Sequence, residues 1–455
     1  MDKNTKILGT GRIGRLLWRF SLPSVMSMLV MLVYNMTDRY FIAESVGADG
    51  IAALAVTTPL FFIAMTLGHM CSVGGNTLFS IRLGEKKEAA AARILSNTFA
   101  FQIILGLAFV LFGSLFLEPI TRLCGGSSIT APLAAEYMGI IMFGMIFEMS
   151  GQGLNNFIRS VGRPRRAMFN NVFGAGLNVL LDWLFMMKFG WGMAGAAAAT
   201  SISMAASFAL AFGFFFAKSA PIRLAIRLPD PAVLLLIFKY GIAPFVSHIT
   251  LAVGAYINNT TLVRHGGDTA LSAFGITDMI ASFGMMVVFG ITHGMQSIAG
   301  YNFGARNWER LRKVVRLTLA CSTLWLAAFA LCGLFFAPGI VGAFSGTGGD
   351  PAMPALAAHM LRSRLLVFPF MAIVWITLTY LSSTGQYWKN LFTHTTRIGF
   401  TICLMLILPR FWGIEGAVWA YPTADSMSVV LTAAIMWRQM KKINAKTLAK
   451  RKAAR

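Results

Sequence analysis

Twelve long apolar runs are the feature that most constrains how this chain can fold. Each holds roughly 20 or more mostly apolar residues, which is the length that a helix needs to cross a bilayer. Lipid offers no partners to free backbone groups, and the runs are too long and continuous for barrel strands. The sequence therefore predicts an all-α polytopic membrane protein with twelve transmembrane helices. The runs lie at 15–43, 51–80, 93–117, 132–158, 165–187, 193–217, 232–263, 270–300, 311–336, 355–384, 388–408 and 413–437.

Composition supports the membrane prediction. The chain is 56% hydrophobic and 12% charged, whereas a soluble domain is about 25% charged. The first apolar run is too long for the core of a signal peptide and lacks a small-residue cleavage site, so we expect it to remain as the first spanning helix. The five cysteines form no CxxC pair, which gives no reason to expect a metal site or a disulfide framework.

The distribution of basic residues predicts the orientation in the membrane. Most of the 39 Lys and Arg fall on one side of the predicted spans, and cytoplasmic loops are the ones enriched in these residues. Both termini are therefore expected in the cytoplasm, and the net charge of +22 needs no nucleic acid partner to explain it. The basic segments are 1–19, 82–93, 159–166, 218–239, 306–316, 389–397 and 438–455.

An internal repeat divides the chain into two halves of six helices. When the first half is shifted along the second, Pro23 falls on Pro244, and a one-residue change of register places Gly74 on Gly294. Six helices per half predict a parallel repeat, as in transporters that bind substrate between their halves. The expected organisation is a first lobe at 1–220, a cytoplasmic linker at 221–231, a second lobe at 232–440 and a basic cytoplasmic tail at 441–455.

Acidic residues within the apolar runs are the first candidates for function, because a carboxylate in lipid is costly and usually faces a bundle interior. Counted from the outer ends of their helices, Asp38, Asp182 and Thr200 each lie roughly 9–10 Å inside the outer face. Asn178 lies one turn deeper than Asp182, on the same face of its helix. These four residues can therefore meet at similar depth.

Two chemistries fit this group of four residues. Hard oxygen ligands suit Na⁺, whereas two neighbouring carboxylates in a pocket of low dielectric suit a proton. In the second half, the position of Asp38 carries Asn259 and that of Asp182 carries Cys403, so we expect one cation site, in the first half alone. The alternative is that the four residues serve only as polar contacts between helices or as exposed helix ends.

Further candidates are less constrained. Glu148, Asp278 and Asn259 are candidates to line a central cavity. Pro23 and Pro244 occupy matched positions and predict bends, either static or used to close a cavity, because proline removes a helical hydrogen bond. No phosphate loop, HExxH zinc motif or GxSxG elbow occurs, so we expect neither an enzyme nor a cofactor beyond H⁺ or Na⁺ as the coupling ion.

The sequence resembles the multidrug and toxic compound extrusion (MATE) family over nearly its whole length, and most of all its bacterial DinF-like and MepA-like branch. The resemblance rests on Pro23 and on the segments 35–39, 52–55, 159–164 and 178–182. It implies two six-helix lobes forming a V, and a first-lobe cation site at Asp38, Asn178, Asp182 and Thr200. Some branches also use second-lobe acids for Na⁺, but here Asn258 and Asn259 stand in the seventh helix, with Asp278 as a remnant.

The resemblance implies a cation-coupled (H⁺ or Na⁺) antiporter that exports amphipathic organic cations. We expect a monomer in the bacterial inner membrane, with the lipid bilayer as its surroundings. A lipid-linked precursor flippase of the same superfamily is the main alternative, and it predicts a strongly basic cavity. A membrane-embedded transferase would need clustered acids in a loop, and a receptor would be expected to carry further soluble domains; the sequence shows neither.

Overall fold

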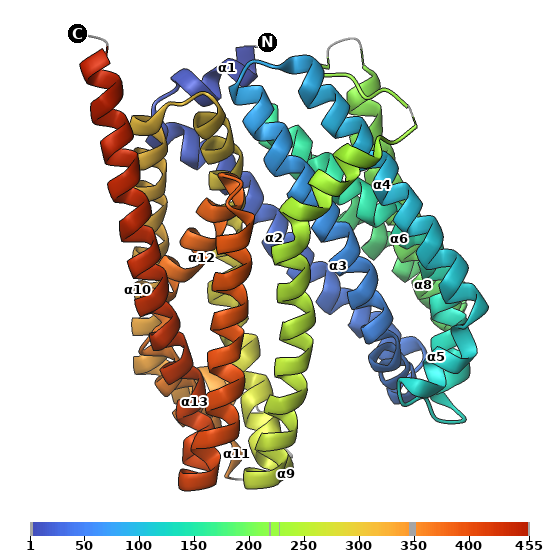
Figure 1. Cartoon of the computed structure of the whole chain (residues 1–455). Helices are drawn as coiled ribbons and strands as arrows, with labels where there is room; N and C mark the ends of the chain where they lie inside the picture. Colours follow the sequence, from blue (N-terminus) through green and yellow to red (C-terminus); the bar gives the residue numbers. More distant parts are fainter. Residues whose placement is uncertain (1–2, 218–219, 227, 345–351, 454–455) are drawn as a thin grey trace. The chain divides into compact units, whose positions relative to one another are not determined.

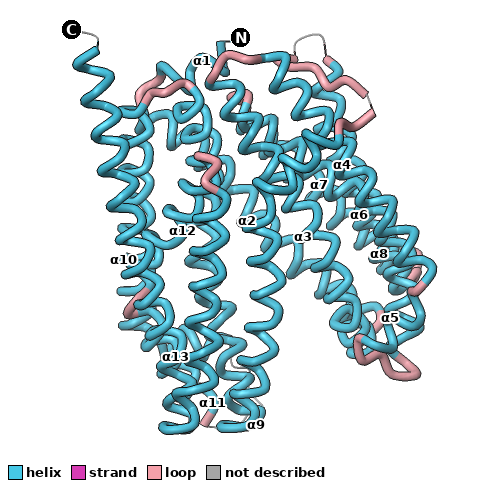
Figure 2. Tube along the Cα trace, viewed as in Figure 1, coloured by secondary structure: helices cyan, strands magenta, loops and turns pink. Residues whose placement is uncertain are grey.

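The computed structural model describes residues 3–217, 220–226, 228–344 and 352–453. Within these residues the chain is built of helices and contains no strand (Figures 1 and 2). Parts of the predicted basic segments at 1–19, 218–239 and 438–455 lie outside the described residues. The helices are α1 (Lys3–Thr10), α2 (Ile13–Ser45), α3 (Ala48–Gly84), α4 (Glu88–Leu115), α5 (Leu117–Leu123), α6 (Thr130–Ser160), α7 (Pro164–Asp182), the π-helix η1 (Trp183–Lys188), α8 (Gly192–Phe216), α9 (Pro231–Gly304), α10 (Trp308–Phe344), α11 (Met353–Leu365), α12 (Phe368–Ser383) and α13 (Tyr387–Ala453).

The described helices cover the twelve predicted spans: α9 and α13 each cover two, α7 with η1 covers one, α11 with α12 covers one, and the short helices α1 and α5 are additional. α9 is interrupted at Gly267 (φ 63°) and α13 at Gly413 (φ 55°). Both angles lie in the left-handed region, which glycine adopts without steric penalty. By length and composition, eight of the described helices can cross a membrane, or nine when α11 and α12 count as one span bent by 55°.

The chain forms two compact units. The first comprises Met1–Gly11 and Met26–Phe245, and the second comprises Arg12–Val25 and Val246–Arg455. The chain passes from one unit to the other within α2, just after Pro23, and again within α9, just after Pro244. The beginning of α2 thus belongs to the second unit, and the beginning of α9 belongs to the first. The predicted lobes are instead divided by the order of helices along the chain, and their boundaries remain a prediction.

In the first unit, α6 packs against α3, α4, α7 and α8 (Figure 1). Its core is rich in Met and Ala, with Met138, Met142 and Met145 fully buried. α1 covers the turn after α6, where Thr5 Oγ1 donates to the carbonyl of Val161 at 3.1 Å. Small residues let these helices approach closely, which is the usual basis of helix packing in lipid.

The second unit has its own core, in which α10 packs against α11, α12 and α13. Two ion pairs lie in it. Arg364 Nη1 is 2.9 Å from Asp278 Oδ1, and Arg397 Nη2 is 3.6 Å from Asp425 Oδ1. The Arg364 guanidinium also lies over the ring of Tyr421. In each of these two pairs a basic side chain lies close to an acidic one, as expected for charges in apolar surroundings.

Among the close glycine contacts between helices, one in each unit occupies an equivalent position. In the first unit, a Cβ at Gly74 of α3 would clash with the carbonyl of Ile237 and lie 2.9 Å from the nitrogen of Gly241. In the second unit, a Cβ at Gly294 of α9 would lie 2.6 Å from Ser21 Oγ. Gly74 and Gly294 are also matched by the internal repeat, so the two units contain equivalent contacts at equivalent positions.

We predict that Gly74→Ala destabilises the protein by about 1–3 kcal/mol, because the added methyl group would overpack a contact between two backbones. Gly176→Ala is the matched control: no heavy atom lies within 4 Å of a Cβ there, and Ala is favoured over Gly in helices by about 1 kcal/mol. Thermal unfolding of the detergent-solubilised variants measures both effects. Equal melting temperatures for the two variants would contradict the close contact.

Candidate functional site

Asn178 joins two neighbouring helices of the first unit. Its Nδ2 donates to Thr200 Oγ1 on α8 at 3.1 Å, and a second contact at 3.5 Å reaches Asp182 Oδ1 one turn further along α7. Thr200 is also hydrogen-bonded with Tyr137 of α6. Asn178, Asp182 and Thr200 are all buried. The structure thus brings together three of the four residues grouped by the sequence, and the i, i+4 spacing on α7 accounts for one of the contacts.

Asp38 of α2 is the fourth residue of the group, and electrostatic interactions connect it to the others. Its charge interacts with that of Asp182, and the Tyr34 hydroxyl interacts with both carboxylates. Arg39, its neighbour in the chain, also interacts with Asp38. The structure records no hydrogen bond between the described residues Asp38 and Asp182, so the two acids are neighbours through space and do not share a bond.

Three residues of this group each carry a buried oxygen atom without a partner. Within the described residues, Asp38 Oδ1, Asn178 Oδ1 and Asp182 Oδ2 are each buried and accept no hydrogen bond. Buried polar atoms are nearly always paired in folded proteins, so three exceptions in one place call for an explanation. Three hard oxygens, two of them from carboxyl groups, are ligands suited to Na⁺ or acceptors suited to a proton.

The backbone changes form beside Asp182. α7 ends at this residue, and the following six residues, Trp183–Lys188, form the π-helix η1. Such widened turns are rare and frequently occur at functional sites. The apolar run at 165–187 predicts one regular helix and gives no indication of this change.

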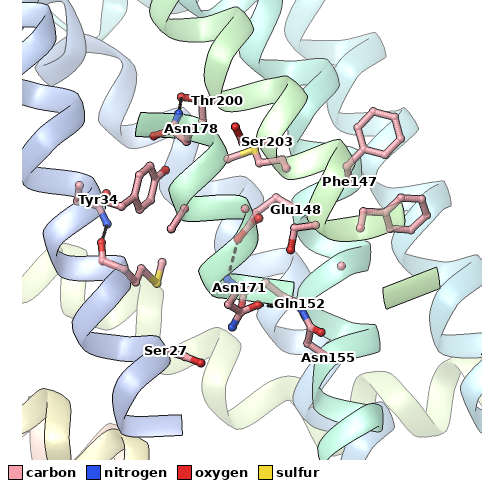
Figure 3. Close-up of a pocket in the computed structure, with 18 of the residues that line it drawn as sticks. Ser27, Tyr34, Phe147, Glu148, Gln152, Asn155, Asn171, Asn178, Thr200 and Ser203 are labelled. Carbon is pink, nitrogen blue, oxygen red and sulfur yellow. Dashed lines mark hydrogen bonds between the residues drawn. The ribbon is translucent and has the colours of Figure 1, made fainter. Parts of the chain in front are cut away.

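A cavity of about 130 Å³ lies next to this group, within the first unit (Figure 3). Side chains of α2, α3, α6, α7 and α8 line it, and Asn178 and Thr200 form part of its wall. Most of the remaining lining is aromatic or apolar, with Phe61, Phe147 and Phe208 and three methionines, Met31, Met65 and Met204. None of the described residues that line it is Lys, Arg or His.

Glu148 is the acid in the lining of this cavity. Figure 3 shows it among Gln152, Asn171 and Tyr34. Gln152 Nε2 donates to Glu148 Oε1 at 2.7 Å. The sequence analysis named Glu148 as a cavity candidate, and the structure places it in this one.

A polar stripe continues from Glu148 along one face of α6. Gln152 and Asn155 follow Glu148 at the i+4 and i+7 positions, and polar residues further along α6 are paired with α3 and α7. Asn155 Nδ2 donates to Asn171 Oδ1 at 2.9 Å, and Ser160 Oγ donates to Asn76 Oδ1 at 2.7 Å. This stripe contrasts with the Asp182 group, where buried oxygens lack partners.

The other sequence candidates lie elsewhere. Asp278 is half-exposed in the second unit and pairs with Arg364. Asn259 is exposed on α9, and its Oδ1 accepts a long contact of 3.4 Å from Asn258 Nδ2. Neither lines the cavity described above. Pro23 and Pro244 lie inside α2 and α9, each within two residues of a change of unit.

Several residues of the site were not anticipated from the sequence. Tyr34, Tyr137 and Gln152 all contribute to it, and only Gln152 carried a usable signal, because Glu148, Gln152 and Asn155 share one helical face. A tyrosine on an apolar helix gives no comparable indication.

The MatE family model matches residues 23–184 and 244–407, so each match begins at one of the two prolines related by the repeat. The multidrug export protein MepA of Staphylococcus aureus (strain N315) is 26% identical over 421 residues, covering 92% of each chain.

Two solved structures are similar to this chain over nearly its whole length. One is an outward-facing multidrug resistance MATE family transporter of the MOP superfamily, with a TM-score of 0.90 at 21% identity, covering 98% of this chain and 99% of the other. The other is a MATE in a bent conformation, also with a TM-score of 0.90 at 21% identity, covering 99% of each chain. At this identity the likeness shows the fold, and it confirms the predicted fold class.

We predict that Thr200→Val lowers the stability of the protein by about 1–3 kcal/mol, because it leaves the buried Asn178 amide without its acceptor. Thr200→Ser retains the hydroxyl and should recover most of this loss. Thr58→Val removes an exposed hydroxyl that bonds only within its own helix, and should change stability by less than about 0.5 kcal/mol. Thermal unfolding of the wild type and the three variants tests the contact. An unchanged melting temperature for Thr200→Val would contradict it.

Proposed function

This chain belongs to the MatE family, and from that premise we propose that it is a cation-coupled antiporter that exports amphipathic organic cations by alternating access. It is a multi-pass membrane protein of a transporter family, not a catalyst. The proposal extends to this chain the export of multiple drugs for which its relative MepA is named.

One observation supports the proposal most strongly. Three buried oxygens without partners, on Asp38, Asn178 and Asp182, adjoin an apolar cavity whose described lining contains no basic residue. The unpartnered oxygens suit a small inorganic cation, and the cavity suits a larger organic one, because aromatic faces attract cations and methionine adapts to varied shapes. An antiporter of organic cations needs both.

Coupling requires that the inorganic cation bind the inward-open and outward-open states with different affinity. We propose that incoming H⁺ or Na⁺ neutralises Asp38 and Asp182, with Asn178 and Thr200 as further oxygen ligands in the case of Na⁺. Asn178 contacts both Thr200 and Asp182, so a cation at Asp182 would compete for bonds that also hold the wall of the cavity.

Pro23 and Pro244 are proposed as the bending points of this cycle. Each removes a backbone donor from the interior of a helix that changes unit within the next two residues. A relative of known structure has been solved in a bent conformation. For location and assembly we propose the bacterial inner membrane, cytoplasmic termini and a monomer.

The flippase alternative receives less support. A lipid-linked diphosphate would require Lys or Arg in its binding cavity, and the described lining of this cavity contains none. The arginines Arg364 and Arg397 of the second unit are each close to an aspartate. The organic-cation proposal is therefore the better supported of the two.

We predict that Asp182→Asn reduces gradient-driven ethidium transport by at least about tenfold, because the amide carries no negative charge for the coupling cation to neutralise. Everted vesicles or proteoliposomes, with Na⁺ and H⁺ gradients imposed separately, measure the effect and identify the ion. The fold is checked by the melting temperature of the variant.

Asp49→Asn provides the matched control, since it makes the same substitution at an exposed residue of the first turn of α3. It should transport at the wild-type rate. Wild-type transport that responds to neither gradient would overturn the antiporter proposal and make the flippase the next hypothesis. Full activity of Asp182→Asn would overturn the assignment of the coupling site alone.

A further inference from the structure

The cavity of the first unit contains a carboxyl group that the proposed coupling cycle does not use. Glu148 lines the cavity, whereas Asp38 and Asp182 do not. Its recorded partner among the described residues is the amide of Gln152, and no Lys, Arg or His side chain of the described chain pairs with it. Glu148 is thus a carboxyl without a counter-ion in an apolar part of a membrane protein.

A carboxylate in such surroundings is expected to face a partner of opposite charge, because apolar surroundings do not solvate it. The hydrogen bond from Gln152 Nε2 occupies Oε1 at 2.7 Å and fixes the orientation of the carboxyl group. Oε2 remains available to a ligand. In addition, the Tyr34 hydroxyl interacts electrostatically with Glu148, Asp38 and Asp182, which places one aromatic side chain among all three acids.

The surroundings of Glu148 specify the kind of cation. Phe147 and Phe208 have ring centroids 5.5 Å apart and both line the cavity, as do Met31, Met65 and Met204. Aromatic faces and methionine thioethers favour a large cation with a spread or alkylated charge over a hydrated metal ion. A volume of about 130 Å³ also exceeds what a metal ion needs.

We propose that Glu148, held by Gln152, is the counter-ion of the organic cation substrate and forms a site separate from the Asp38–Asp182 coupling group. This inference rests on the proposed function and deepens it. The substrate and the coupling cation then occupy adjacent sites that share Asn178 and Thr200 as a wall, instead of replacing one another on the same carboxylate. Discrimination in favour of cations comes from Glu148.

The two sites predict different phenotypes for two variants with the same chemical change. Glu148→Gln should weaken binding of tetraphenylphosphonium to the purified, detergent-solubilised full chain by at least about tenfold, because it removes the one carboxyl among the described residues that line the cavity. Asp182→Asn should bind this probe within about threefold of the wild type while losing gradient-driven transport. Titration calorimetry measures the affinities, and proteoliposome efflux measures the transport.

Two further variants serve as controls. Glu148→Asp keeps the charge and should recover part of the affinity that Glu148→Gln loses, which separates the charge from a packing effect. Glu118→Gln makes the same carboxyl-to-amide change at an exposed residue of α5 that pairs with Arg122, and should bind the probe as the wild type does. A melting temperature close to that of the wild type establishes that Glu148→Gln is folded.

The outcomes separate this inference from the proposed function. If wild-type transport is gradient-driven but Glu148→Gln binds tetraphenylphosphonium with unchanged affinity, Glu148 is not the counter-ion. If Asp182→Asn loses probe affinity as strongly as Glu148→Gln, the two cations share one site and the separation is wrong. If the wild-type protein neither binds the probe nor responds to a gradient, the proposed function itself fails.

Discussion

Apolar surroundings leave a buried polar atom with only protein partners, and this constraint determines the arrangement of the first unit. Three polar residues of α6 meet the constraint: Gln152 donates to Glu148, Asn155 to Asn171 and Ser160 to Asn76. At the Asp182 group it is not met, since three buried oxygens of the described chain have no partner. Single atoms elsewhere in this unit, such as Thr77 Oγ1 and Ser150 Oγ, also lack a partner, but two carboxyl oxygens grouped with an amide oxygen are what suits a cation.

The candidate coupling group and the cavity are chemically different but physically joined. Hard oxygens dominate the first, and aromatic rings and methionines dominate the second. Asn178 belongs to both, since its amide contacts Asp182 and Thr200 and its side chain lines the cavity. In the proposed mechanism this single amide allows occupancy of one site to alter the shape of the other without a shared carboxylate.

The internal repeat reproduces packing contacts between helices but does not reproduce the acidic residues. Gly74 and Gly294 make equivalent close contacts, one in each unit. At the positions of Asp38 and Asp182, however, the second half carries Asn259 and Cys403, both exposed. Its charges are instead close to one another, as Arg364 and Asp278 show. Packing requirements recur in both halves, whereas the acids needed for a cation site occur in one.

The sequence by itself determined the helical spans and the pairing of Asn178 with Asp182. Both depend on local properties, namely the apolar length that lipid demands and the spacing of residues on one helix. Only the tertiary structure decided that Tyr34 meets the acids, that Glu148 lines a cavity and that the beginning of α2 groups with the second unit. These features depend on how helices rotate and cross, and no local pattern in an apolar sequence specifies the face that each helix presents to its neighbours.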